Sequence, residues 1–375
     1  MGVNSIRNMV LVICLLSYSS IGYAKFYDMY RADYTKGAFC SALAGACASD
    51  NNPENSFFQN PASLESAGTE LVYDGDFNPS DNLEPGMKTS SVLDQSTYMG
   101  GIAIAGPMWG YGLSMSGRSS SVNASATLVD DQDRSQSLNT KNSSTTIFFN
   151  FPFAKRVSPK FSVGIALLGM YYLESFEIEN SPKSKTNSLD KFPQLGLSLG
   201  YLYSFSNYFR IGSWFRSPIT YYVKQEIDVQ QFSNQVRITE DLGLNYPLIF
   251  SNGISYMPWG DQRTFLLDLD LVGKTTNGFE RTLDVFSTAV NETSAAARFK
   301  GRKIALEPHL AWRSPWWTGA KGTYTLGTYY ENGRWDKIFG RIHGVTSVAY
   351  ELGIFEAIVA VDVAKEYFNL LFSFR

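Results

Sequence analysis

Apolar and polar residues alternate along most of the chain that follows Thr69. The segment QLGLSLGYLYSF (194–205) places leucine or an aromatic residue at every odd position, with small or polar residues at most even positions. The segments TFLLDLDLVG (264–273), IALEPHLAWR (304–313) and FEAIVAVDVA (355–364) alternate in a similar way. Alternation with a period of two is typical of β-strands that have one apolar face. The pattern therefore predicts an all-β chain.

The connections between these strands alternate between short and long. Short ones such as FSNY (205–208) and PWGDQ (258–262) separate long ones at 76–97, 118–143, 176–191, 230–241 and 273–301. Short turns at one end and long loops at the other are typical of transmembrane β-barrels. Tryptophans lie near the short turns, where an interfacial girdle is expected: Trp109, Trp259, Trp316 and Trp317. These features favour a barrel over the alternative, a soluble secreted β-sandwich.

The long connections are polar, and two of them, around 118–143 and 176–191, are especially rich in Ser, Asn, Asp and Lys. We expect these two segments to be flexible solvated loops. The chain as a whole has 15% aromatic residues, 18% charged residues and a net charge of only −3, which gives no basis for nucleic-acid binding. At about 9–11 residues per spanning strand plus loops, the chain after Gly68 suffices for about 12 to 14 strands.

Residues 1–24 have the features of a cleaved signal peptide. Arg7 precedes the apolar run MVLVICLL (9–16), and the small-residue segment SSIGYA ends at Ala24. The apolar run is far shorter than the ~20 residues of a transmembrane helix. The sequence therefore predicts an exported chain.

Export permits a disulfide between Cys40 and Cys47. On a continuous helix the two residues would lie about 10.5 Å apart along the axis, which exceeds the roughly 7 Å limit between bridged Cα atoms. A disulfide therefore requires a bend, for which Gly45 is the candidate, and two free buried thiols are the alternative. We expect no metal site, because two cysteines without a nearby histidine fall short of four ligands.

Two segments resemble those of one known family. In 36–68, a Gly/Ala-rich stretch is followed by Asp50 and then by Asn60-Pro61-Ala62. In YLYSFSNYFRIGSWFRSPI (201–219), a tyrosine-bearing strand and a short turn precede an Arg-x-Gly strand that ends in Arg-Ser-Pro. In this order, behind a signal peptide, they resemble the hatch and a mid-barrel hairpin of the FadL/TodX family of outer-membrane transporters for hydrophobic compounds.

The resemblance implies a transmembrane antiparallel barrel of fourteen strands (69–375), plugged by a small N-terminal hatch with short helical segments (25–68). It implies the outer membrane of a Gram-negative bacterium, with both termini in the periplasm. Ligand would bind in the lumen and leave by hatch movement or through a lateral gap. Long-chain fatty acids are the default ligand. The implied partners are outer-membrane lipid and lipopolysaccharide, and the barrel-assembly machinery during biogenesis.

The candidate residues for substrate binding or gating lie in these two segments. Asn60-Pro61 forms a rigid turn that either gates the barrel or fits the plug to the wall. Arg210 and Arg216 face the lumen, where they bind a carboxylate or pair with acids such as Asp268 or with the hatch. The full set is Phe57, Phe58, Asn60, Pro61, Ala62, Arg210, Trp214 and Arg216, with Trp214 able to stack on a ligand.

The uncharged inward positions suit an amphipathic ligand better than an ion pore: Ala166, Leu168, Met170 and Leu202. The leading hypothesis is thus uptake of hydrophobic or amphipathic molecules. A partner in secretion or surface attachment, using the polar loops for protein contact, and a structural porin are the alternatives. Neither His309 nor His343 belongs to a nucleophile-elbow or metal motif, so we expect no enzyme, catalytic residue or cofactor.

Overall fold

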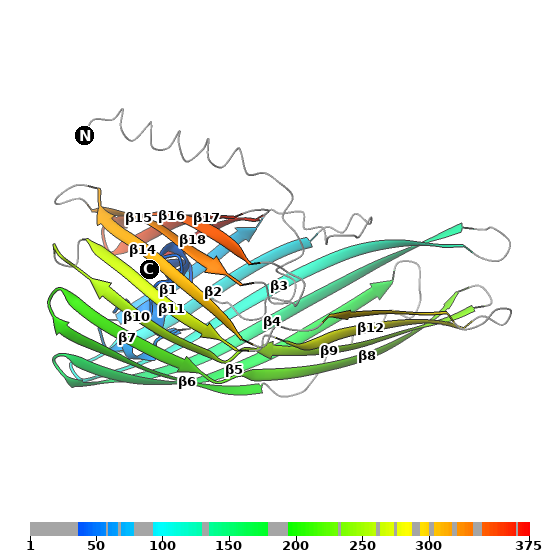
Figure 1. The fold of residues 1–375 in the computed structure, drawn as a ribbon, viewed down its shortest axis with the longest axis horizontal. Helices are drawn as coiled ribbons and strands as arrows, with labels where there is room; N and C mark the ends of the chain where they lie inside the picture. The colour runs from blue at the N-terminus through cyan, green and yellow to red at the C-terminus, as the bar shows by residue number, and fades with distance from the viewer. Residues whose placement is uncertain are drawn as a thin grey trace, which may run out of the picture.

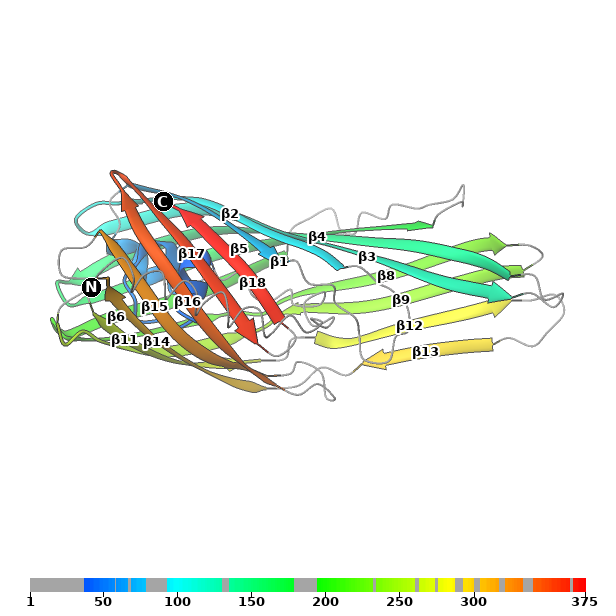
Figure 2. The same ribbon diagram turned by 90° about the horizontal axis from the view of Figure 1, so that it is seen from above.

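Fourteen antiparallel strands close into a barrel in the computed structural model of this chain (Figures 1 and 2). Each strand pairs with its neighbours around the barrel, and β1 pairs with β18 to close it. The predicted antiparallel barrel of about fourteen strands is confirmed. The structure describes residues 37–57, 59–66, 69–78, 93–129, 135–178, 194–231, 234–259, 263–273, 276–286, 293–299, 304–316, 321–332, 340–364 and 367–375; the predicted signal peptide and residues 25–36 lie outside them.

The barrel strands vary in length. They are β1 (Thr69–Asn78), β2 (Leu93–Ala105), β3 (Trp109–Val129), β4 (Ser135–Ser158), β5 (Phe161–Ile178), β6 (Gln194–Ser206), β7 (Phe209–Arg216), β10 (Ile249–Tyr256), β11 (Thr264–Val272), β14 (Ala305–Pro315), β15 (Gly322–Glu331), β16 (Arg341–Leu352), β17 (Phe355–Ala364) and β18 (Tyr367–Phe374).

The alternation in sequence becomes an inside-out arrangement of side chains. Along β10, Ser251 and Ser255 are buried in the barrel, whereas Phe250 and Tyr256 are exposed on its outer surface. Leucines of β6 and β11 are exposed in the same way. An exposed belt of large apolar side chains would be unfavourable in water and is typical of a surface that faces lipid.

Beyond the barrel, four strands form a second sheet, in the order β13, β12, β9, β8. They extend the hairpins of the barrel wall, as the long right-hand part of Figures 1 and 2 shows. Pro218 separates β7 from β8, and Pro247 separates β9 from β10, where proline's missing N–H interrupts the ladder. The bounds are β8 (Ile219–Gln231), β9 (Asn234–Tyr246), β12 (Thr276–Phe286) and β13 (Thr293–Phe299).

The expectation of a flexible loop is therefore wrong for 118–143, and two further long connections also contain strands. Segment 118–143 continues β3 and β4, segment 230–241 contains the start of β9, and segment 273–301 contains β12 and β13. The polar composition of these segments indicated loops. The hydrogen bonds between strands, however, join backbone N–H and C=O groups, which every residue except proline has whatever its side chain. Most of 76–97 and of 176–191 lies outside the described residues.

The segment 37–66, which we call the hatch, lies inside the barrel. It contains α2 (Ala38–Ala42) and two 3-10 helices, η1 (Pro53–Phe57) and η2 (Pro61–Ser66). Helix α2 packs against β17 and β18, and η2 packs against β4, β5 and β6. In the part of the chain that the structure describes, no helix has the length and apolar character needed to cross a membrane.

A disulfide joins Cys40 to Cys47, and the chain between them bends as the bond requires. Ala44 and Gly45 have positive φ angles of 52° and 79°, which reverse the chain after α2. The two Cα atoms consequently lie 5.7 Å apart, within the range for a bridge.

Replacing both cysteines by serine should destabilise the hatch by about 2–3 kcal/mol, because the short loop regains its conformational freedom in the unfolded state. Hydrogen exchange of the Ala42–Ala48 amides should become faster, while amides of β10 and β11 stay protected. Reducing agent should reproduce this effect on the parent chain and have none on the double variant. Unchanged exchange in the double variant would contradict the prediction.

Candidate functional site

Glycines on the inner wall make room for the backbone of the hatch. A Cβ atom at Gly164 would overlap the backbone of Pro61 and Ala62, and one at Gly212 would overlap the carbonyl of Ala48. A Cβ atom at Gly200 would overlap the side chain of Asn60. Any larger residue at these positions must displace the hatch or the wall, so the hatch fits closely against β5, β6 and β7.

Asn60 connects two parts of the hatch to the wall. Its side-chain amide Nδ2 donates to the carbonyl oxygens of Ala48, at 2.8 Å, and Tyr201 in β6, at 3.0 Å. Its Oδ1 accepts from the N–H of Ala62 at 3.1 Å. The residue is fully buried. The Asn-Pro-Ala turn therefore fixes the hatch to the wall through a side chain with both donor and acceptor atoms.

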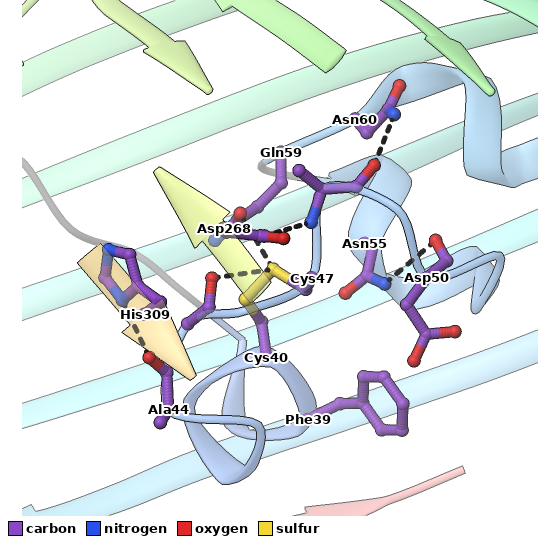
Figure 3. The surroundings of a disulfide bond; sticks show 12 residues. Phe39, Cys40, Ala44, Cys47, Asp50, Asn55, Gln59, Asn60, Asp268 and His309 are labelled. Atoms are coloured by element: carbon purple, nitrogen blue, oxygen red, sulfur yellow. Dashed lines mark hydrogen bonds between the residues drawn. A yellow bond between two sulfur atoms is a disulfide. The ribbon is translucent and has the colours of Figure 1, made fainter. Parts of the chain in front are cut away.

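Two buried side chains hold the hatch from β11 and β14, two and three strands further round the wall from β7 (Figure 3). Asp268 Oδ2 accepts from the N–H of Ala48 at 2.6 Å. His309 Nδ1 lies 2.8 Å from the carbonyl oxygen of Ala44, and since a carbonyl only accepts, Nδ1 carries the proton. A third contact is the ion pair between Arg313 and Asp50, at 3.1 Å.

His309 belongs to a larger network of buried polar side chains. Its Nε2 lies 3.2 Å from Asp270, and its ring stacks on Tyr329, which in turn stacks on His343 with centroids 4.2 Å apart. The hydroxyl of Tyr329 donates to Asp362 at 2.7 Å. These contacts extend from the hatch along neighbouring strands of the barrel.

The end of the network that lies furthest from His309 also carries charged side chains. His343 lies between two carboxylates, with Nδ1 2.8 Å from Asp362 and Nε2 2.9 Å from Glu331. Arg341 Nε donates to Glu331 at 2.8 Å. We call the polar wall the set of Asp268, Asp270, Glu307, His309, Tyr329, Glu331, Arg341, His343 and Asp362, which come from β11 and β14–β17. Among the described residues, no group of His, Cys, Asp and Glu has the arrangement of a metal site.

Buried apolar side chains come from the strands on the other side of the barrel. We call the apolar wall the set of Met99, Phe148, Ala166, Leu168, Met170, Leu202 and Trp214, which come from β2 and β4–β7. The four inward positions noted in the sequence as uncharged are all among them. Small polar residues such as Asn150, Ser162 and Ser198 are buried on the same strands. The two sides of the barrel interior therefore differ in that the buried acids named above all belong to the polar wall.

The structure brings some predicted site residues together and separates others. Phe57 is fully buried; a Cβ atom at Gly101 would overlap its ring, and one at Gly112 would be in tight contact with it at 3.2 Å. Phe58 lies outside the described residues. Pro61 and Ala62 lie against Gly164 in β5.

Arg210 and Arg216 do not form one site. Arg210 is next to a short turn, where its Nε donates to Ser204 at 3.3 Å. Arg216 is six positions further along β7, about 20 Å away at 3.3 Å per residue. There it is buried, and its guanidinium carbon lies 5.9 Å from the ring centroid of Trp214.

Sequence reasoning missed most of the polar wall as a candidate site. Asp270, Glu307 and His309 were visible as polar residues opposite apolar ones in alternating strands. That signal places them inside a barrel, but it does not show that Tyr329, His343 and Asp362 meet them. The contacts cross between strands, so a single sequence does not reveal them.

The ladder between β3 and β4 lacks two pairs close to Phe57, with the register unchanged on either side. The pairing passes from Tyr111–Phe153 directly to Ser114–Asn150. Pro152 lies in the interval and has no N–H to donate. This part of the wall has fewer backbone bonds to hold its two strands together.

No protein-family model matches this chain, and no curated protein matches it either. Solved structures do. The P. putida toluene transporter TodX aligns with a TM-score of 0.65 and 11% identity, over 91% of this chain and 98% of its own. The monoaromatic hydrocarbon channel CymD aligns with a TM-score of 0.58 and 13% identity, over 94% and 97%. A Pseudomonas aeruginosa FadL homologue aligns with a TM-score of 0.53 and 10% identity, over 95% and 98%.

This chain has the FadL-type barrel fold. The alignments cover nearly all of both chains, so the FadL-type likeness includes the barrel and is not restricted to one hairpin. It agrees with the family resemblance drawn from the hatch and mid-barrel motifs. At this level of identity the likeness concerns the fold, and the ligand has to be inferred from the lumen of this FadL-type barrel itself.

Proposed function

We propose that this FadL-type barrel takes up hydrophobic or amphipathic small molecules across the outer membrane. The observation that carries the proposal is the apolar wall, which includes Phe148, Leu168 and Met170, inside a barrel that the hatch fills. A water-filled ion pore would need a lumen ringed by polar groups. An apolar lining on one side suits a ligand with an apolar body.

The outward belt of apolar side chains supports a place in a membrane, in contact with outer-membrane lipid and lipopolysaccharide. We place the hatch and the short turns toward the periplasm and the outer sheet of β8, β9, β12 and β13 toward the outside. With this orientation the chain would act as a channel, and we propose no enzymatic activity for it. The two missing pairs of the β3–β4 ladder beside Phe57 support a lateral exit, and the many hatch contacts oppose an exit that expels the hatch.

The substrate class is drawn from two sources. TodX is described as a toluene transporter and CymD as a monoaromatic hydrocarbon channel, and the family resemblance makes long-chain fatty acids the default. All are apolar over most of their length, and that shared property is what the apolar wall recognises. Hydrophobic uptake in general is therefore the proposal, with fatty acids as one member of the class.

Uptake of labelled toluene and of a labelled long-chain fatty acid by cells with and without this chain tests the proposal. We expect slower uptake of at least one compound without it. Leu168→Asp should lower that uptake about tenfold or more, because the ligand would have to pass a charge on the apolar wall. Leu168→Met is the matched control and should leave uptake unchanged. Equal uptake by cells with and without the chain, for every hydrophobic compound tested, would sink the proposal.

A second candidate function is contact with a partner protein in secretion or surface attachment. The outer sheet favours it, since β13 pairs only with β12 in the described part of the chain and so has an edge available for a further strand. Purification in mild detergent discriminates the two, because a transporter should elute alone. A structural porin would instead show a high conductance in planar bilayers.

A further inference from the structure

We infer that the outer surface of the barrel binds anionic phospholipids at its short-turn end, through four consecutive turns of the wall. These turns join β2 to β3, β4 to β5, β6 to β7 and β10 to β11, at the end opposite the outer sheet (Figure 1). We call residues 106–110, 153–161, 205–210 and 257–264 the basic arc. The inference rests on the proposed orientation, in which these turns face the periplasm and meet the phospholipid leaflet of the outer membrane.

Backbone hydrogen bonds join each turn of the basic arc to the next. The N–H groups of Arg156, Ser204 and Met257 donate to the carbonyl oxygens of Met108, Lys160 and Tyr208, at 2.9, 2.8 and 2.8 Å respectively. The first bond joins the β4–β5 hairpin to the β2–β3 turn, and the other two continue to β6–β7 and to the end of β10. Side chains from four hairpins therefore share one continuous surface.

The basic arc has more basic than acidic residues. Its basic residues are Lys155, Arg156, Lys160, Arg210 and Arg263, and the one acidic residue in its sequence is Asp261. Asp261 lies outside the described residues, and the excess of basic residues remains when it is counted against one of them. Residues 25–36, which precede the hatch, add three basic and two acidic residues and do not reverse the sign. The surface is therefore positively charged by composition.

Three of these cations lie on the outer side of the barrel. Lys155 and Arg263 are each two positions from an exposed outward residue, Phe153 on β4 and Phe265 on β11, and side chains two positions apart on a strand share a face. Lys160 is exposed in the turn between β4 and β5. Within the described part of the chain, none of the three forms an ion pair with a carboxylate. The other two basic residues of the arc have inward positions on β4 and β7.

Two of the outward cations lie over exposed tryptophan rings. The Nζ atom of Lys155 is 4.5 Å from the ring centroid of Trp109, and the guanidinium carbon of Arg263 is 5.3 Å from the ring centroid of Trp259. Both tryptophans are exposed. Tryptophan at a membrane surface lies at the level of the lipid head groups. The two cations are therefore held at the depth where lipid phosphates lie.

The composition of the surface favours an anionic phospholipid over a zwitterionic one. Exposed apolar side chains continue from the basic arc along the same strands, where they would contact acyl chains: Tyr111, Leu113, Phe151, Ile165 and Leu167. The ammonium group of phosphatidylethanolamine is repelled by the cations, whereas phosphatidylglycerol brings only its phosphate charge. One lysine or arginine near a membrane surface favours anionic lipid by about fivefold. The occupant is therefore phosphatidylglycerol or a lipid of the same charge class.

Native mass spectrometry of the purified full-length barrel tests the inference. The barrel in mild detergent is mixed with equal amounts of phosphatidylglycerol and phosphatidylethanolamine that have the same acyl chains. We expect phosphatidylglycerol to be retained at least about fivefold more than phosphatidylethanolamine, as one cation beside the head group requires. Raising the ammonium acetate concentration from about 0.1 M to about 1 M should lower this ratio, because the Debye length falls from about 10 Å to about 3 Å.

Variants locate the lipid. Lys155→Gln, Lys160→Gln and Arg263→Gln combined should bring the ratio of the two lipids close to unity, whereas Lys155→Arg, Lys160→Arg and Arg263→Lys combined keep the charges and should keep the ratio. Lys160→Gln alone should lower the ratio about twofold or more, since one of three cations is lost. Lys321→Gln is its matched control, because it removes an exposed lysine from the β14–β15 turn, outside the basic arc, and should leave the ratio unchanged. Heat-modifiable gel mobility checks that each variant is folded.

The outcomes separate the inference from the proposed function. Equal retention of the two lipids by the parent barrel overturns the inference, and so does an equal fall in the ratio in Lys160→Gln and Lys321→Gln, which indicates a general charge effect. Lipopolysaccharide in place of phosphatidylglycerol, bound by the parent and lost from the triple glutamine variant, overturns the inference and also contradicts the proposed orientation. Uptake of hydrophobic compounds is measured separately in cells. A barrel that selects phosphatidylglycerol at the basic arc but supports no uptake upholds the inference and contradicts the proposed function.

Discussion

Gly212→Ala should unplug the barrel. A Cβ atom at this position would overlap the carbonyl of Ala48, which is backbone and has no rotamer by which to move away. Overpacking of a fixed site costs about 3 kcal/mol, which shifts the ratio of docked to displaced hatch by roughly a hundredfold. We expect planar-bilayer recordings to show frequent large openings that are rare in the parent chain.

Gly344→Ala is the matched control. Gly344 is also a barrel glycine, but a Cβ atom there would meet only the carbonyl of Val363, at 3.9 Å. Its conductance should equal that of the parent. A Gly212→Ala barrel that is folded and conducts like the control would show that the hatch tolerates a shift from the wall, and the close fit would then have no gating importance.

Asn60→Asp should release the hatch at least as effectively. The substitution keeps the shape of the side chain but replaces the Nδ2 donor with an oxygen that faces the carbonyls of Ala48 and Tyr201. A buried charge without a partner costs about 3–5 kcal/mol. Hydrogen exchange at the amides of Ala62 and Ser63 should become about a hundredfold faster or more, and protease should cut the hatch in folded barrels.

Asn207→Asp controls for the chemistry of the substitution, because Asn207 is exposed in the short turn between β6 and β7. It should leave hatch exchange unchanged. Asn60→Ala should have a smaller effect than Asn60→Asp, since it removes hydrogen bonds without adding a charge. Equal protection of the hatch in Asn60→Asp and the parent would contradict a fixing role for this side chain.

The barrel could be predicted from the sequence because its strands carry a local signal. Alternation in 194–205 and 264–273 identifies both the strand and the face that points outward, and the burial pattern of β11 follows it residue by residue. The outer sheet escaped prediction for a physical reason. Its strands are rich in polar residues, and the pairing of β9 with β12 depends on backbone bonds between distant segments.

The candidate site could be predicted only in part. The Asn-Pro-Ala motif marked the hatch. The alternation of inward and outward side chains along β7 placed Trp214 and Arg216 inside the barrel. The contacts between the hatch and the wall could not be derived from the sequence. Asn60 and Tyr201 are 141 positions apart in the chain, and His309 and Ala44 are 265 positions apart. Contacts of this separation depend on the closure of the barrel, which no local pattern encodes.

The separations between the hatch and its partners also imply an order of assembly. The hatch precedes all of the barrel strands in the chain, and Ser347, which donates to the carbonyl of Ala42, follows 305 positions later. The glycines of β5, β6 and β7 lie closer to the hatch in sequence than His309 and Ser347 do. Since closing a longer loop costs more conformational entropy, we expect the contacts of the hatch with β5, β6 and β7 to form before those with β14 and β16. The hatch would then be a template for the barrel before it is its plug.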